Sequence, residues 1–128
     1  MMAGRLCTAL LAFCLAGAAQ ADQRARASEL LEMWQPQSVA IEDGVLKVVL
    51  PQDRISEEIY FAVLTAGLCL GFAMEKPLNG LSGVEVLNRH VRQGYVFERG
   101  LEDCDAWNER PAGSPMTRLE ILGATHLY

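Results

Sequence analysis

Residues 59–74 read IYFAVLTAGLCLGFAM, and this stretch decides how the rest of the chain can fold. Its sixteen residues carry no charge, and Tyr60 and Thr65 supply the only hydroxyl groups. A helix without a polar side must be buried nearly all round, inserted in a membrane or covered by a partner. A spanning helix needs about 20 apolar residues. We therefore expect a central apolar helix inside the fold, over about residues 57–72.

Polar residues set the limits of this helix. Ser56 suits the N-cap position, and Glu57 and Glu58 place carboxylates in the first turn, where the helix dipole favours negative charge. Glu75 and Lys76 stand at the other end. The polar residues at the two ends thus confine the apolar stretch to about four turns.

Small residues recur inside the helix with a spacing of four. Gly67 and Gly71 form a G-x-x-x-G pattern, and Ala62 and Ala66 repeat the spacing one step away. Small side chains at this spacing allow a second backbone to approach closely. We expect these four positions to contact a neighbouring element of the fold or a partner.

The first 21 residues have the organisation of a secretory signal peptide. Arg5 provides positive charge, residues 6–16 are apolar, and Ala19-Gln20-Ala21 is a small-x-small cleavage site. Lipidation at Cys14 is an alternative, but the bulky Phe13 before it does not suit that modification. We expect cleavage after Ala21 and export to the periplasm or to the outside of the cell.

The mature chain would be a small acidic domain. Of 128 residues, 51% are hydrophobic, and the formal net charge is −5. Cleavage after Ala21 leaves 107 residues and, because Arg5 is lost, a net charge of −6. This length predicts a single domain over residues 22–128. The negative charge argues against nucleic acid as a partner.

Two cysteines remain after cleavage. Cys69 and Cys104 form an even pair in an oxidising compartment, which favours a disulfide. Free thiols and redox chemistry are alternatives, although catalytic dithiols usually occur as C-x-x-C. Only His90 and His126 could join them around zinc, and the spacing matches no common site, so we expect no metal.

The remaining pattern predicts an α+β fold. We expect an antiparallel sheet of four to five strands packed against the central helix, with a short N-terminal helix as a second cover and the bridge joining helix to hairpin. Asp43-Gly44 between two apolar runs is a strong hairpin signal. The expected strands are 39–41, 45–50, 84–88, 95–98 and 118–122, the last with Leu119 and Ile121 inward. A further helix is expected over residues 25–35, and a short helix or tight turn over residues 101–108.

Two polar clusters are candidate binding sites. Five carboxylates gather late in the chain and form either a solvated surface or a docking face for a basic partner; they are Glu98, Glu102, Asp103, Asp105 and Glu109. The EF-hand pattern is absent, which argues against a calcium loop. Arg89, His90 and Arg92 lie between two expected strands, where they either bind a carboxylate or phosphate or form an exposed hairpin tip.

The sequence contains none of the common catalytic motifs. There is no G-x-S-x-G, P-loop, dinucleotide-binding glycine pattern or HExxH. We therefore expect a non-enzymatic, exported protein-binding module without a cofactor, such as an immunity or inhibitor protein or a small envelope-complex subunit, whose partner is another protein or a second copy of itself. One alternative is a small hydrolase or ligand-binding domain using Arg89, His90 and Arg92. Another is membrane association through Ile59–Met74, which the short span argues against. An exposed face of the central helix in the single chain would favour binding.

Overall fold

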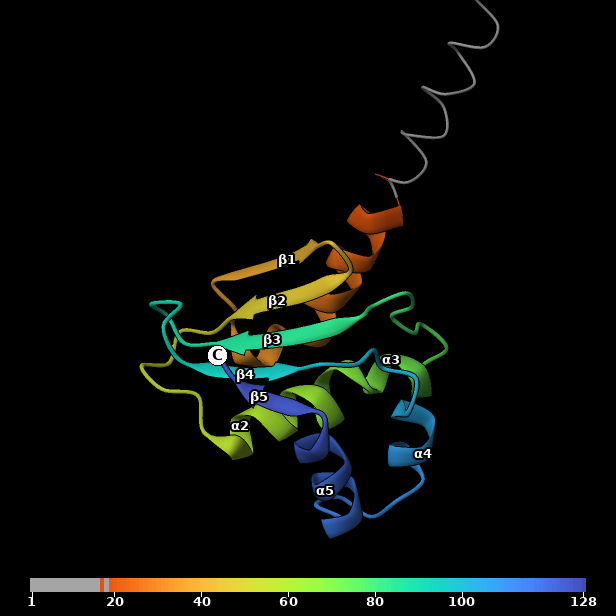
Figure 1. Ribbon diagram of the computed structural model, residues 1–128. Helices are drawn as coiled ribbons and strands as arrows, with labels where there is room; N and C mark the ends of the chain where they lie inside the picture. Colours follow the sequence, from red (N-terminus) through yellow and green to blue (C-terminus); the bar gives the residue numbers. More distant parts are fainter. Residues whose placement is uncertain (1–16, 18) are drawn as a thin grey trace, which may run out of the picture.

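The computed structural model describes residue 17 and residues 19–128, so nearly all of the expected signal segment lies outside the described part. A five-stranded sheet forms one layer, and the helices pack on one face of it (Figure 1). The fold is α+β, as the sequence predicts. The strands follow the chain order β1-β2-β3-β4-β5 and are Ser38–Glu42, Val45–Val49, Gly83–Leu87, Gly94–Phe97 and Thr125–Leu127.

The pairing in the middle of the sheet corrects the expectation of an antiparallel sheet. Strands β1 and β2 form the expected hairpin around Asp43-Gly44, where both residues have positive φ. Strands β2 and β3, however, are parallel, with Leu46 opposite Val84. The chain leaves β2, crosses the sheet through the central helix and returns in the same direction, as parallel neighbours require. The sheet is therefore mixed.

The expected last strand is also wrong. Residues 118–122 belong to helix α5, Pro115–Gly123, and the fifth strand β5 follows it. Pro115 occupies the first turn of α5, a position where proline is favoured. Thr117 and Ile121, four residues apart, are buried on one side of this helix, whereas Leu119 is 70% exposed. Burial therefore follows helical spacing.

The central helix covers the expected residues but is not uniform. It consists of α2, Glu57–Ala62, a π-helical segment η2, Val63–Leu68, and α3, Leu70–Ala73. The Ser56 hydroxyl accepts a hydrogen bond from the Ile59 amide, which confirms the N-cap. In the π segment the Cys69 amide donates to the Leu64 carbonyl, five residues back.

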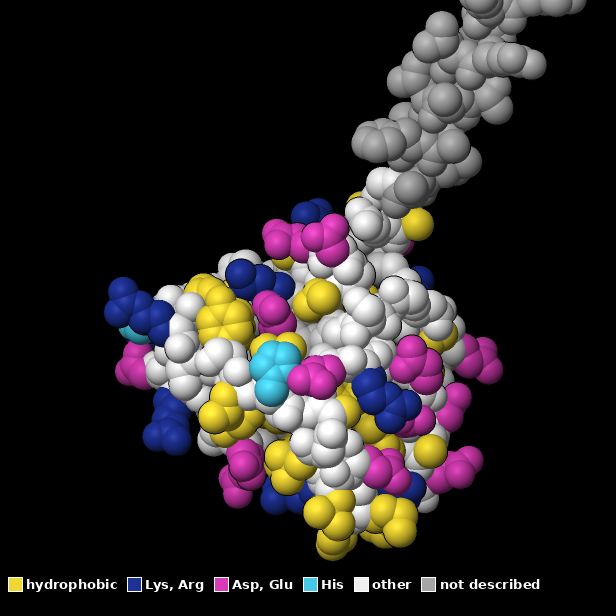
Figure 2. Space-filling model, in the orientation of Figure 1, with side chains coloured by type: hydrophobic (Ala, Val, Ile, Leu, Met, Phe, Trp, Pro, Cys, Tyr) yellow, Lys and Arg dark blue, Asp and Glu magenta, His cyan; other side chains and the backbone are white. Residues whose placement is uncertain are grey.

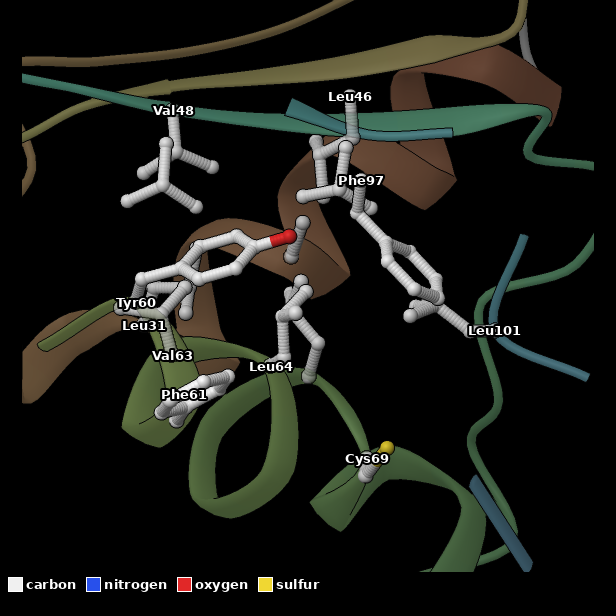
Figure 3. Close-up of a cluster of buried hydrophobic side chains, with 14 of the residues drawn as sticks. Leu31, Leu46, Val48, Tyr60, Phe61, Val63, Leu64, Cys69, Phe97 and Leu101 are labelled. Carbon is white, nitrogen blue, oxygen red and sulfur yellow. The ribbon is translucent and has the colours of Figure 1, made fainter. Parts of the chain in front are cut away.

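The core lies between the sheet and the helices. Figure 3 shows Tyr60 and Leu64 of the central helix directed toward Val48 and Phe97 of the sheet, with Leu31 beside them. Leu31 follows the N-terminal helix, residues 19–30, and precedes the 3₁₀ turn η1, Glu32–Trp34. An N-terminal helix is therefore present and contributes to the core, but it spans residues 19–30 instead of the expected 25–35.

A disulfide joins the central helix to the C-terminal part of the chain. Cys69 and Cys104 are bonded, with both side chains fully buried, as the sequence predicts. Cys104 opens the short helix α4, Cys104–Asn108. At the same junction the Asn108 amide group donates to the Cys69 carbonyl at 3.0 Å. These bonds hold α4 against the end of the central helix.

Candidate functional site

A groove of about 420 Å³ runs between the central helix and the α4–α5 segment. Phe61, Ala62 and Ala66 line it from the central helix, and Trp107 and Ile121 line it from the opposite side. Its volume falls in the range of sites that hold small ligands or anchoring side chains. The two walls are far apart in the sequence, and the disulfide holds them together because it fixes α4 to the central helix.

The small residues of the central helix divide between two neighbours. A Cβ atom on Gly67 would lie 2.9 Å from side-chain atoms of Leu31 and Trp34, so this glycine allows the N-terminal segment to pack closely. A Cβ atom on Gly71 would lie 2.7 Å from the Lys76 carbonyl oxygen. Both glycines therefore serve contacts within the chain.

The alanines of the same pattern face the groove instead. Ala62 is half-buried, Ala66 is exposed, and both line the groove. Ala66 and Gly67 are adjacent within the π segment, and adjacent positions of a helix face different sides. The central helix is thus covered on most sides, and a narrow strip that includes Ala66 stays open.

A hydrogen-bond network holds the opposite wall of the groove. Glu120 accepts from the indole N–H of Trp107 at 2.8 Å and from the guanidinium of Arg110 at 3.0 Å. Arg110 also donates to the Thr117 hydroxyl at 3.3 Å. Hydrogen bonds from Arg110 and, next, from Trp107 hold the pKa of the Glu120 carboxyl below its ordinary value. The network fixes α4 to α5.

Two further charged side chains, Arg118 and Glu58, line the groove outside this hydrogen-bond network. Arg118 places its guanidinium 4.8 Å from the centre of the Phe61 ring, a cation–π contact that orients it across the groove. Among the described residues, no oppositely charged side chain lies within ion-pair distance of Arg118 or Glu58. Both residues are exposed and line the groove.

An exposed apolar surface adjoins the groove on the outer side of α5. Met116, Leu119 and Leu122 repeat every three residues and are 59%, 70% and 40% exposed. In Figure 2 hydrophobic side chains gather at the bottom of the view, where Figure 1 places α5. Leu127 of the edge strand β5 is a further large exposed apolar residue.

The residues Arg89, His90 and Arg92 lie away from the groove, on the connection between β3 and β4. Arg89 forms an ion pair with Asp53 at 3.0 Å and donates to the Pro51 carbonyl, so it ties this connection to the segment after β2. His90 and Arg92 are exposed. The structure thus gives Arg89 an intramolecular role and leaves the other two side chains in solvent.

The five carboxylates of the acidic cluster are divided between separate places. Glu98 pairs with His126 across β4 and β5, and Asp103 pairs with Arg99 at 3.2 Å. The other three are exposed around α4; they are Glu102, Asp105 and Glu109. Within the described residues, no group of three or more His, Cys, Asp or Glu side chains could hold a metal ion.

Sequence reasoning missed the groove residues on the C-terminal side. The expected strand over residues 118–122 includes Arg118, and no helix or strand is expected at Arg110 or Thr117, so the sequence does not indicate that the three share a wall. The pair Ser114-Pro115 could have indicated the start of a helix, because Ser is favoured at the N-cap and Pro in the first turn. In the part of the chain that the structure covers, no helix has both the length and the hydrophobicity to cross a membrane.

Comparison of the chain with protein-family models, with curated proteins and with solved structures finds no match. The fold alone does not define an activity, because one architecture serves many functions. The function must therefore be argued from the groove and the surfaces around it.

Proposed function

We propose that this chain is an exported, non-enzymatic protein-binding module that receives a segment of a partner protein in the groove beside the central helix. The observation that carries the proposal is an open strip of this largely buried apolar helix, which at Ala62 and Ala66 lines a groove. A concave apolar surface with a few oriented polar groups is typical of a binding site. An inhibitor of a toxin or hydrolase, or a small subunit of an envelope complex, has these properties.

The local backbone supports this proposal. π-Helical segments are rare and occur frequently at functional sites. Here the segment Val63–Leu68 supplies Thr65 and Ala66 to the groove, next to Ala62. The hydroxyl of Thr65 donates to the Phe61 carbonyl at 2.7 Å, so this side chain leaves apolar surface toward the groove. The π segment thus helps to form an apolar wall without a competing polar group.

Export is supported by the bridge and by the contacts of the N-terminal helix. A buried disulfide suits an oxidising compartment. The side-chain hydrogen bonds of this helix to the rest of the fold come from Gln23, to Asn79, and from Arg26, to Pro77. Both residues follow the expected cleavage site after Ala21. The intact mass of the exported protein should correspond to a chain beginning at Asp22, and a mass that retains residues 1–21 would contradict cleavage there.

Two alanines of the central helix provide a matched test of the groove. Ala66 lines it, whereas Ala73 is an exposed alanine of α3 that does not. A phenylalanine at position 66 would fill the groove, and one at position 73 would point to solvent. Affinity capture from an extract of the producing cells should therefore yield a stoichiometric partner with the unmodified chain and with Ala73→Phe, but not with Ala66→Phe.

The outcomes of this capture experiment are decisive. A partner retained equally by all three proteins binds elsewhere, and the proposed site would be wrong. A monomer without any stoichiometric partner would overturn the proposed function. Thermal melting of both variants checks that each is folded before the comparison is made.

A further inference from the structure

We propose that the groove recognises the chain end of its partner: the C-terminal carboxylate binds Arg118, and the last side chain, which is apolar, packs on Phe61, Ala66 and Trp107. This inference rests on the proposed function, because it names the part of the partner that occupies the same groove. It is drawn from the hydrogen bonds and charges of the groove lining.

Most polar groups of the lining are already satisfied within the chain. The indole N–H of Trp107 is bonded to Glu120, and Asn108 donates to the Cys69 carbonyl. Thr65 donates to a backbone carbonyl, and Thr117 accepts from Arg110. These side chains therefore present mainly carbon atoms to an occupant. The groove walls act as apolar surface despite their polar residues.

Arg118 is the exception among the cations of the lining. Arg110 is paired with Glu120, whereas Arg118 has no ion-pair partner among the described residues. Arginine binds carboxylates with paired hydrogen bonds. The first turn of α5 faces the same groove, and the partial positive charge there has the same sign. Arg118 and this helix end thus offer positive charge from the α5 wall, whereas Glu58 lines the groove from the central helix.

The short distance between the Arg118 guanidinium and the Phe61 ring indicates that the occupant is a chain end. The guanidinium carbon of Arg118 lies 4.8 Å from the centre of the Phe61 ring, so the carboxylate and the apolar side chain of an occupant must be close together. In an extended segment, neighbouring side chains point to opposite faces. An internal acidic residue would therefore direct its carboxylate away from the adjacent apolar side chain. A C-terminal residue carries both groups on one Cα atom.

Two acetylated synthetic peptides test the proposal, Gly-Ser-Gly-Ser-Gly-Phe with a free C-terminal carboxylate and the same peptide with a C-terminal amide. Binding is followed by titration of the backbone amide signals in NMR spectra of the mature protein. The acid should bind at least about tenfold more tightly than the amide, because only the acid forms a charge-assisted bond with Arg118. The shifted signals should map to residues 58–66 and 107–118.

Substitution of Arg118 shows whether this residue causes the preference. Arg118→Gln should abolish the difference between acid and amide, and Arg118→Lys should retain part of it. Arg92→Gln removes an exposed arginine outside the groove and should leave the difference unchanged. Arg118 is exposed, so these variants should fold, and the dispersion of the NMR spectra verifies it.

Several results would overturn the inference. Equal affinity of the two peptides in the groove, a preference that persists in Arg118→Gln, or no binding of either peptide would each do so. An amidated peptide ending in Asp-Phe that binds as tightly as the free acid would exclude the chain-end assignment. None of these results would remove partner capture that depends on Ala66, so failure of the inference is distinguishable from failure of the proposed function.

Discussion

Removing the disulfide is the perturbation whose effect can be worked out most directly from the structure. The variant is Cys69→Ala combined with Cys104→Ala, so that no buried thiol is left unpaired. Both side chains are fully buried, and the two residues are 35 positions apart in sequence. Because alanine fits both helical positions, the main change is the loss of the cross-link.

The expected loss of stability follows from the length of the closed loop. In the chain-entropy description, a cross-link across about 35 residues lowers the free energy of the folded state relative to the unfolded state by about 4 kcal/mol. Domains of this size are usually stable by about 5–15 kcal/mol. The double variant should therefore be only marginally folded, with α4 and the groove wall most affected because the bridge joins α4 to the central helix.

Urea unfolding followed by circular dichroism measures this loss. The double variant should unfold at lower urea concentration and with a larger m-value, because its unfolded chain is less compact and exposes more surface. The unmodified protein kept in reductant should behave like the double variant. A loss below about 1 kcal/mol with an unchanged m-value would refute the reasoning, since the contacts between α3 and α4 would then restrict the chain without the bridge.

Three further predictions follow from individual residues. Gly94→Ala should destabilise the fold by roughly 3 kcal/mol or more, because the φ of Gly94 is 154° and a Cβ atom there would lie 2.0 Å from a backbone oxygen of β3. Gly123→Ala is the control, since a Cβ atom at Gly123 meets open space. Equal melting temperatures of the two variants would contradict this prediction. Burial raises the pKa of Tyr60 to about 12, so above pH 10 the unfolded chain loses the phenol proton before the folded chain does, and the free energy of unfolding should fall between pH 10 and 12 by up to roughly 2 kcal/mol. In urea unfolding at a series of pH values, Tyr60→Phe should lack this part of the alkaline decline. An unchanged decline would exclude Tyr60 as its source. The hydrogen bond from Arg110 lowers the pKa of Glu120. The contribution of the Glu120 carboxylate to stability is therefore complete above the pKa of Glu120 in the unfolded chain and is lost as the pH falls through its pKa in the folded chain. Acid unfolding of Glu120→Gln should show a shallower dependence on pH in this range.

Local signals explain why the central helix could be predicted. The apolar run at 59–74 and the cap at Ser56 are properties of neighbouring residues, and the structure keeps both. The hairpin at Asp43-Gly44 was predictable for the same reason, because the turn conformation depends on these two residues. The π segment was not predictable, because a single wider turn leaves the apolar pattern of the helix unchanged.

Short windows explain the errors. In residues 118–122, alternation with period two and helical spacing both fit five positions, so the pattern could not separate strand from helix. Extending the window to Ser114-Pro115 and to the pair Thr117 and Ile121 would have favoured a helix. Likewise, strand–helix–strand order across residues 45–87 indicates a parallel pair, a rule of chain connection that hairpin signals alone do not contain.

The groove required the tertiary fold. Its walls come from residues 58–66 and 107–121, and no feature of either segment's sequence predicts that it lies beside the other. Only the cysteine pair linked the two regions in the sequence, and it predicted their proximity without predicting the space between them. The charges of the groove were equally hidden, because Arg110 and Arg118 acquire different roles through partners that lie on other elements.

The alanines of the central helix connect the packing of the fold to its proposed use. Leucine has nearly the helix propensity of alanine, and at position 66 it would bury additional apolar area toward the facing wall of Trp107 and Ile121. Stability alone therefore does not account for a small side chain at this exposed position. The glycines of the same helix differ, because a Cβ atom at Gly67 or Gly71 would lie only 2.7–2.9 Å from other atoms of the chain. A small side chain at an open position of an apolar helix leaves space that the packing of the fold does not need, and a binding groove requires such space.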